Sequence, residues 1–389
     1  MTRPPTGWHF LQLPGPSNVP ARVLEAISRA TIDHRGPDFP ALTNEVLDGL
    51  RMVFGTHGPV VIFPASGTGG WEASLVNTLD HGDRVLFVET GQFAANWIEV
   101  ARRFGLQVDV METDWRRGAE PARIEERLAA DTAHEIQAVA VVHNETSTGA
   151  MTRIAGVRAA IERAGHPALL LVDAVSSVGS MTYLHDDWRV DVTIAASQKG
   201  LMLPPGLAFL AMSEKAMAVS KQARLPRSYW DWNAMLAQNE RGYFPYTPST
   251  NLLFGLREAL AMLREEGLDA VIRRHARHGR AARTAVRAWG LETQCVVPDE
   301  VCDVITAVVM PDGHDADRFR ALVLERFNMA LGTGLGRLKG RVFRIGHVGD
   351  MNDLMLIAAL AGVESGLILA GAPITRGGVD AAMRSLEAE

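Results

Sequence analysis

The chain has 389 residues, of which 47% are hydrophobic and 22% are charged, and its formal net charge is −6 at pH 7. This length exceeds what one compact core usually holds, so we expect two domains. The negative balance argues against a nucleic-acid-binding protein, which needs a basic surplus to neutralise phosphates. No apolar run is long enough to span a membrane and the N-terminus lacks a cleavable apolar stretch, so we expect a cytoplasmic protein with no membrane partner.

The first two thirds of the chain, residues 21–255, alternate short apolar runs with helical patterns. The runs are rich in Val, Ile and Leu and are bounded by Gly, Asp or Pro, which is typical of buried strands. The predicted strands are 60–63, 84–88, 107–111, 138–143, 168–172, 190–195 and 206–211, and helical patterns between them include 70–79, 93–104 and 154–164. This alternation predicts an α/β fold, with a mostly parallel seven-stranded sheet in a large domain and helices on both faces.

The last third predicts a smaller α+β domain. A long, charged helical region at 256–289 comes first, and we interpret its arginines as a solvated face that joins the two domains. A strand at 303–310, a helix at 316–327, a strand at 341–345 and a helix at 353–369 follow. A glycine-rich stretch at 332–336 lacks the spacing of a dinucleotide site and is interpreted as a hairpin or loop before the second strand. We therefore expect an N-terminal arm at 1–20, a large domain at 21–255, and an interdomain helix with a small domain at 256–389.

Several strands of the large domain end in residues suited to one ligand, because ligands of open α/β sheets gather beyond the carboxyl ends of the strands. Ser66, Gly67 and Thr68 follow the first strand and open a helix. Glycine allows close approach, and the free N–H groups of a helix start favour an anion. The sequence predicts a phosphate site here, although such a stretch taken alone can be a simple helix cap.

Asp173 and Lys199 follow two further strands, and Lys199 comes directly after Gln198. A lysine amine can condense with the aldehyde of pyridoxal phosphate as a Schiff base, and a carboxylate can keep the pyridine nitrogen protonated. The alternative is a structural Asp–Lys pair at the rim. Hydroxyl groups at Thr146 and Thr148 and an aromatic ring at Phe93 follow two more strands, and the joint pattern favours the cofactor.

The cysteines and histidines form no metal-binding pattern. Cys295 and Cys302 have the spacing of neither a zinc site nor a disulfide framework. The histidines show no pair at helical spacing together with an acid. We therefore expect no bound metal.

At the level of motifs, the sequence resembles the serine–glyoxylate and alanine–glyoxylate aminotransferases, which are class-V, fold-type I enzymes dependent on pyridoxal phosphate. The matching motifs are Ser66-Gly67-Thr68-Gly69, His143-Asn144-Glu145-Thr146-Ser147-Thr148-Gly149, Leu169-Leu170-Leu171-Val172-Asp173, Ser197-Gln198-Lys199, Pro245-Tyr246-Thr247-Pro248 and Phe343-Arg344-Ile345-Gly346-His347. They occur in order between about residues 14 and 363, so the resemblance covers nearly the whole chain.

The resemblance implies a role for each matching residue. Lys199 would hold the cofactor covalently and Asp173 would face its pyridine nitrogen. Ser66, Gly67, Thr68 and Gln198 would bind the phosphate, Phe93 would stack on the ring, and one of Thr146 and Thr148 would contact cofactor or substrate. Thr247 would reach the phosphate in the neighbouring subunit, which implies a homodimer with shared active sites. Arg344 would hold the substrate carboxylate, for which a planar guanidinium is well shaped.

The function implied is transfer of an amino group from a small amino acid, with serine favoured, to glyoxylate, which gives glycine. Aspartate or alanine as donor is the alternative within the same chemistry. A lyase or cysteine desulfurase of the same fold would need a reactive loop cysteine. A cofactor-binding regulator is disfavoured because the sequence contains no DNA-binding segment and every catalytic position is filled.

Overall fold

The computed structural model describes residues 7–388. Its strands form a seven-stranded sheet, a four-stranded sheet and a two-stranded hairpin. The strands are β1 (Phe10–Gln12), β2 (Val60–Phe63), β3 (Arg84–Glu89), β4 (Gln107–Glu112), β5 (Ile136–Val142), β6 (Asn144–Glu145), β7 (Ala150–Met151), β8 (Leu169–Asp173), β9 (Val192–Ala196), β10 (Ala208–Met212), β11 (Ile305–Val309), β12 (Met329–Thr333) and β13 (Val342–Gly346). The helices are α1 (Ala21–Ile27), α2 (Phe39–Phe54), α3 (Gly67–Thr78), α4 (Gln92–Arg103), α5 (Pro121–Ala129), α6 (Ile154–Arg163), α7 (Glu214–Ser220), α8 (Trp232–Asn239), α9 (Thr250–Glu266), α10 (Leu268–Ala288), α11 (Ala316–Phe327), α12 (Asp353–Leu369) and α13 (Gly378–Glu387).

The seven-stranded sheet has the order β2-β10-β9-β8-β5-β3-β4. β10 is antiparallel to both of its neighbours, and the other pairs are parallel. Every residue of β2, β8, β9 and β10 is buried, as expected for a sheet covered on both faces. The predicted α/β fold and its mostly parallel sheet are confirmed, and each predicted strand is present with ends shifted by two residues at most.

The strand directions bring several chain segments to one edge of this sheet. β2 and β9 are both antiparallel to β10, so they point in the same direction. Because β9, β8, β5 and β3 form parallel pairs, they share that direction as well. α3 begins after β2 and packs on β9 and β10, and α4 begins after β3 and packs on β3 and β4. The first turns of both helices therefore lie at the carboxyl edge, where the predicted site residues of the large domain also lie.

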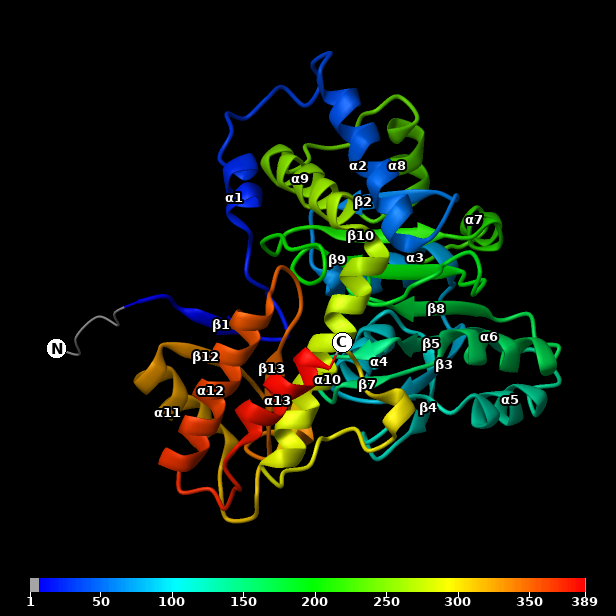
Figure 1. The fold of residues 1–389 in the computed structure, drawn as a ribbon. Helices are drawn as coiled ribbons and strands as arrows, with labels where there is room; N and C mark the ends of the chain where they lie inside the picture. The colour runs from blue at the N-terminus through cyan, green and yellow to red at the C-terminus, as the bar shows by residue number, and fades with distance from the viewer. Residues whose placement is uncertain (1–6, 389) are drawn as a thin grey trace.

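The four-stranded sheet joins the two ends of the sequence, with the order β1-β12-β13-β11. β1 runs parallel to β12, with Phe10 opposite Met329, and Figure 1 shows this N-terminal strand beside the C-terminal third of the chain. β13 is antiparallel to β11 and β12, so the glycine-rich stretch does lead through a hairpin into the Arg344 strand. A separate apolar core, which includes Trp289, Phe319 and Phe343, packs beneath this sheet.

The helical region predicted at 256–289 is two helices rather than one. α9 ends and α10 begins at Gly267, whose φ of 83° is in the left-handed region that glycine adopts without strain. The charged periodicity continues on both sides of Gly267, which is why the sequence pattern hides the break. α10 then packs on α9, β11, α12 and α13 (Figure 1).

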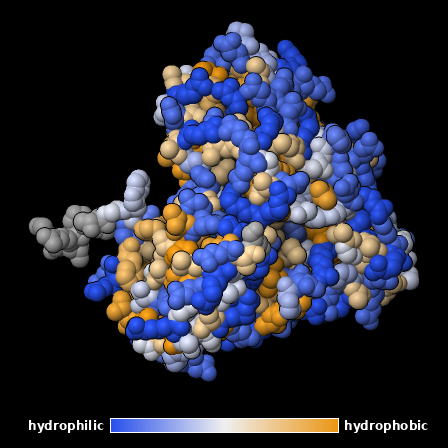
Figure 2. All heavy atoms as spheres, viewed as in Figure 1, coloured by the Kyte–Doolittle hydropathy of each residue, from blue (hydrophilic) through white to orange (hydrophobic). Residues whose placement is uncertain are grey.

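The outer surface is mixed in character. Figure 2 shows hydrophilic side chains over most of this face and apolar groups gathered over the half that contains the four-stranded sheet. Exposed apolar residues on the helices of that half include Leu324, Leu354 and Leu369. None of the helices in the described part of the chain combines the length and apolar character that crossing a bilayer requires.

Candidate active site

A cavity of about 230 Å³ lies at the carboxyl edge of the seven-stranded sheet. Its walls come from the segments that follow β2, β3, β5, β8 and β9, together with the end of the N-terminal arm. The lining residues are Gly15, Pro16, Ser66, Gly67, Thr68, Trp71, Phe93, Val142, Asn144, Thr146, Asp173, Val175, Gln198, Lys199 and Pro205. The structure therefore brings together eight of the predicted site residues, namely Ser66, Gly67, Thr68, Phe93, Thr146, Asp173, Gln198 and Lys199.

Lys199 lies just beyond β9, and its side chain is buried. Its Nζ donates a hydrogen bond to the Pro14 carbonyl at 2.6 Å. Burial, aided by the positive charge of Arg344, lowers the pKa of this amine to about 7. A lysine in this state has a substantial neutral fraction at physiological pH, and the neutral form is the nucleophile.

Asp173 ends β8, the strand that pairs with β9. Its Oδ1 accepts a hydrogen bond from the Val175 N–H at 2.8 Å, and its Oδ2 accepts one from the Trp71 indole N–H at 2.9 Å. Burial raises the pKa of this carboxyl to about 6, although both hydrogen bonds oppose the rise. A cationic N–H in the cavity would favour the charged carboxylate, so the site has the polarity that a protonated ring nitrogen needs.

The start of α3 forms the other end of the cavity. Ser66 stands at the N-cap position with an extended backbone, and its hydroxyl does not cap the helix. Gly67 packs against Val175, and a Cβ added at Gly67 would approach Val175 Cγ2 to 2.7 Å. A helix start with a spare hydroxyl suits an anion, and Gln198 brings a side-chain amide to the same cavity.

Aromatic side chains form one wall. Phe93 lies in the first turn of α4, and its ring meets that of Trp71 at a centroid distance of 6.5 Å and an angle of 64°. Trp71 therefore contacts both Phe93 and Asp173, although it was not among the site residues predicted from the sequence. Helical spacing could have indicated Trp71, because it lies one turn beyond the predicted site residue Thr68 and on the same face of α3.

Thr146 and Thr148 differ in their surroundings. Thr146 lines the cavity, and its hydroxyl shares a hydrogen bond of 2.5 Å with Ser176. Thr148 lies outside the cavity wall, where its hydroxyl donates to the Glu145 carbonyl and accepts from the Ala150 N–H. Asn144 lines the cavity as well and was not singled out, although it lies two residues beyond the end of β5.

Like Thr148, the predicted residues Arg344 and Thr247 are not part of the cavity wall in the chain that carries them. Arg344 lies on β13 behind Thr146, where it donates from Nη1 to the Thr146 carbonyl and from Nε to the Thr333 carbonyl, each at 2.8 Å. A guanidinium has five N–H donors, so these two bonds leave donors for a carboxylate. Thr247 is exposed on the surface after α8.

The end of the N-terminal arm closes the cavity, although none of its residues was among the predicted site residues. The Ser17 N–H and hydroxyl donate to the carbonyls of Gln198 and Lys199, each at 3.0 Å. A Cβ at Gly15 would clash with the Lys199 side chain. The sequence Pro14-Gly15-Pro16 could have indicated a fixed segment that approaches other groups closely, because the prolines stiffen the chain on both sides of a small residue.

These features fit pyridoxal phosphate. Within residues 7–388, the side-chain oxygens of Asn144 and Gln198 are buried without a hydrogen-bond partner. Buried polar groups are normally paired, so unpaired amides at a cavity wall are expected where a ligand completes them. The buried amine, the buried carboxylate and the helix start then match an aldehyde, a ring nitrogen and a phosphate.

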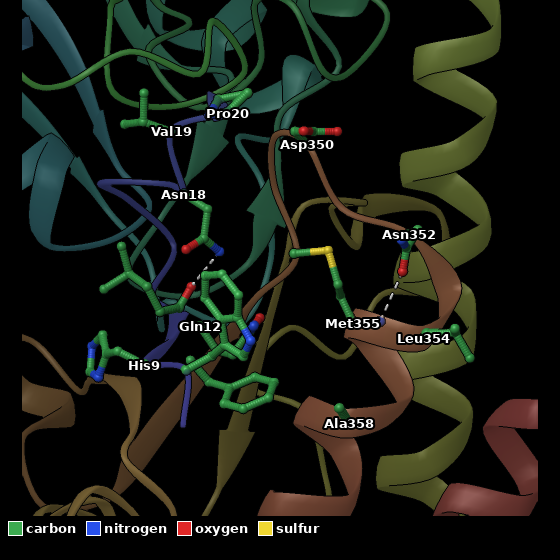
Figure 3. Close-up of a pocket in the computed structure, with 13 residues that line it drawn as sticks. His9, Gln12, Asn18, Val19, Pro20, Asp350, Asn352, Leu354, Met355 and Ala358 are labelled. Carbon is green, nitrogen blue, oxygen red and sulfur yellow. Dashed lines mark hydrogen bonds between the residues drawn. The ribbon is translucent and has the colours of Figure 1, made fainter. Parts of the chain in front are cut away.

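A larger hollow of about 490 Å³ lies between the N-terminal arm and the start of α12 (Figure 3). Figure 3 shows Asn18 bonded to the arm itself and Asn352 bonded to the Met355 N–H, so both polar groups serve local structure. None of the predicted site residues lines it. Size alone therefore does not identify the functional cavity.

The fold is that of the fold-type I enzymes dependent on pyridoxal phosphate, and the chain is of that class. The sequence model of the class-V aminotransferases matches residues 9–336, and the chain belongs to that family. The chain is 52% identical over 388 residues to the serine–glyoxylate aminotransferase of Methylorubrum extorquens, covering 98% of this chain and 96% of that protein. It is 44% identical to the L-aspartate–glyoxylate aminotransferase of Paracoccus denitrificans, covering 95% and 94%.

The similarity extends to solved structures. The ureidoglycine–glyoxylate aminotransferase of Bacillus subtilis has a TM-score of 0.90 and 28% identity, covering 98% of this chain and 99% of that one. The chain is thus an aminotransferase dependent on pyridoxal phosphate.

We expect covalent attachment of pyridoxal phosphate to Lys199 to depend on pH. Because the pKa of Lys199 is lowered to about 7, the neutral amine should rise from about one tenth at pH 6 to about nine tenths at pH 8. The rate at which the apoprotein attaches pyridoxal phosphate should follow this curve. Stopped-flow absorbance measures the rate, and a midpoint above pH 9 would contradict the environment described for Lys199.

Proposed function

We propose that this protein transfers the amino group of a small amino acid, with serine preferred, to glyoxylate and so produces glycine. The observation that carries the proposal is the approach of Lys199 and Asp173 to one cavity from adjacent strand ends. The choice of substrates is supported by the serine–glyoxylate aminotransferase that is 52% identical over nearly the whole chain.

Lys199 and Asp173 have the central roles in this proposal. Pyridoxal phosphate, when bound, supplies an electron sink for the charge that develops at the substrate alpha carbon. Lys199 Nζ would hold the cofactor and would move a proton to and from that carbon. Asp173 keeps a proton on the ring nitrogen through its charge.

The remaining cavity residues bind and orient. Ser66, Gly67, Thr68 and Gln198 hold the phosphate, since they combine a helix start with hydroxyl and amide groups. Phe93 stacks on the ring, and Thr146 contacts cofactor or substrate. Thr146 lines the cavity and Thr148 does not, which supports Thr146 of the two.

The assembly we propose is a cytoplasmic homodimer. Thr247 is exposed and outside the cavity of its own chain, so a phosphate contact from this residue requires the second subunit. We also propose the division into an arm at 1–20, a large domain at 21–255 and an interdomain and small domain at 256–389. Two apolar cores, one beneath each sheet, support this division, and α9 crosses its boundary.

Arg344 is the proposed carboxylate-binding residue, and Arg344→Leu tests it. A charge-assisted hydrogen bond contributes about 1.5–3 kcal/mol, so KM for donor and for glyoxylate should each rise by about 10- to 150-fold. Both substrates share the carboxylate, and glyoxylate has little else to be held by. Steady-state kinetics with each substrate varied in turn measures the effect.

Arg283→Leu is the matched control for that substitution. Arg283 also donates to a backbone carbonyl, that of Cys302, and pairs with Asp303 away from the cavity. We expect both KM values to be unchanged in the control. A rise for only one of the two substrates in Arg344→Leu would mean that they are held by different groups.

The donor is tested by comparing serine, aspartate and alanine against glyoxylate and pyruvate. The serine proposal fails if aspartate is used with tenfold or greater efficiency, and the L-aspartate–glyoxylate relative makes aspartate the second candidate. A desulfurase is disfavoured by the two cysteines. Both are buried outside the cavity wall, and burial raises the pKa of Cys295 to about 11 and of Cys302 to about 12, so neither thiol is readily ionised.

A further inference from the structure

Glu145 lies on β6, between the cavity residues Asn144 and Thr146, and is fully buried. Its carboxylate accepts four hydrogen bonds, all from neutral donors. Two come from the peptide N–H groups of Phe93 and Ala94, at 3.3 and 3.1 Å. The other two come from the N–H and hydroxyl of Ser147, at 3.0 and 2.7 Å.

These bonds join the first turn of α4 to the segment after β5. The Ser147 hydroxyl also accepts a hydrogen bond from the Gln92 N–H at 2.9 Å, so three successive N–H groups of α4 are satisfied from that segment. Helix N-termini have such unpaired donors and carry partial positive charge, and a carboxylate suits both. Glu145 thereby replaces the side-chain cap that α4 lacks, since its N-cap residue is Gly91.

Gly91 packs closely against the Glu145 side chain. A Cβ at Gly91 would clash with the Glu145 Cγ and approach Ser147 Oγ to 2.5 Å, so only glycine allows the carboxylate this near to the helix start. A buried carboxylate that loses its hydrogen bonds is costly, so the turn and the carboxylate hold each other in place.

We propose that Glu145 is a positioning residue of the active site, which sets the Phe93 ring against the strand end that carries Asn144 and Thr146. Phe93 is the first of the two α4 residues whose N–H groups bond to Glu145, and its ring lines the cavity. The negative charge of Glu145 also acts on the pKa of Lys199 and Asp173, which it raises in both cases. This inference rests on the proposed role of Phe93 in cofactor binding.

The test compares Glu145→Gln with Glu364→Gln in the reconstituted holoenzyme. Glu364 is a matched control because its carboxylate caps another helix start, accepting from the Gly377 and Val379 N–H groups at the beginning of α13. Both substitutions should lower the melting temperature. Only Glu145→Gln should weaken pyridoxal phosphate binding, by about tenfold, and reduce the induced circular dichroism of the bound cofactor.

A double-mutant cycle separates positioning from a general loss of stability. If Glu145 acts through Phe93, the losses in cofactor affinity of Glu145→Gln and Phe93→Leu should not add in the double variant. Should Glu145→Gln fail to fold, Ser147→Ala replaces it in the cycle, because it removes the hydroxyl link between Glu145 and the Gln92 N–H.

Additive losses, or equal cofactor binding in Glu145→Gln and Glu364→Gln, would overturn the positioning role and leave the proposed function intact. A wild-type protein that does not bind pyridoxal phosphate would overturn both. Non-additive losses with a reduced cofactor signal are the expected result.

Discussion

Replacing Lys199 with alanine should lower turnover by several orders of magnitude while the protein still binds pyridoxal phosphate noncovalently. The substitution removes the amine that holds the cofactor and carries the proton. It leaves the start of α3 and the Gln198 amide unchanged, and these groups bind the phosphate end in our proposal. Single-turnover kinetics and a cofactor-binding titration separate the two effects.

Borohydride reduction followed by peptide mass spectrometry identifies the attachment point. The other lysines of the chain are Lys215, Lys221 and Lys339, and all three are exposed outside the cavity. Lys215→Ala is the control, since the Lys215 amine only donates to the Pro167 and Ala168 carbonyls. Cofactor recovered on any of these three lysines in the wild-type protein would refute the assignment of Lys199.

The Asp173→Asn variant should fold and bind cofactor, yet turn over about 10- to 150-fold more slowly, the equivalent of one lost charge-assisted hydrogen bond. Both protein partners of Asp173 are donors, namely the Val175 N–H and the Trp71 indole N–H. An asparagine amide has one acceptor oxygen, so it cannot satisfy both and also face a ring N–H. The rate constant for the first half-reaction is the quantity to measure.

Asp191→Asn provides the comparison for Asp173. Asp191 is another buried carboxylate, placed just before β9 at the opposite edge of the same sheet, where it pairs with Arg158 at 2.6 Å. Its replacement should lower the melting temperature without slowing the half-reaction once the protein is folded and loaded. Near-normal turnover in Asp173→Asn would mean that another group keeps the ring nitrogen charged.

The large sheet and the main cavity residues could be predicted because their signals are local. Each buried strand is a short apolar run. Asp173 ends one such strand, and Ser66 and Lys199 each lie three residues beyond the end of another. Parallel strands bring their carboxyl ends to one edge, so sequence order alone was enough to gather these residues.

The features that were missed depend on contacts between distant segments. β1 is three residues long and pairs with β12, so no local periodicity marks it. From the sequence alone, Trp71 is indistinguishable from an ordinary core residue of α3, because its contact with Asp173 depends on the fold. The break at Gly267 is invisible because the residues on both sides share one helical pattern.

The pairing of β1 with β12 also constrains how the protein is made. The ribosome releases the strands of the seven-stranded sheet as one continuous stretch, and domains generally fold as units during synthesis. Residues 329–333 emerge much later, so until then β1 has no partner strand, although Ser17 can already bond to Gln198 and the Pro14 carbonyl can already accept from Lys199. The cavity walls and the contacts of Pro14 and Ser17 can therefore form before β1 is fixed in the four-stranded sheet.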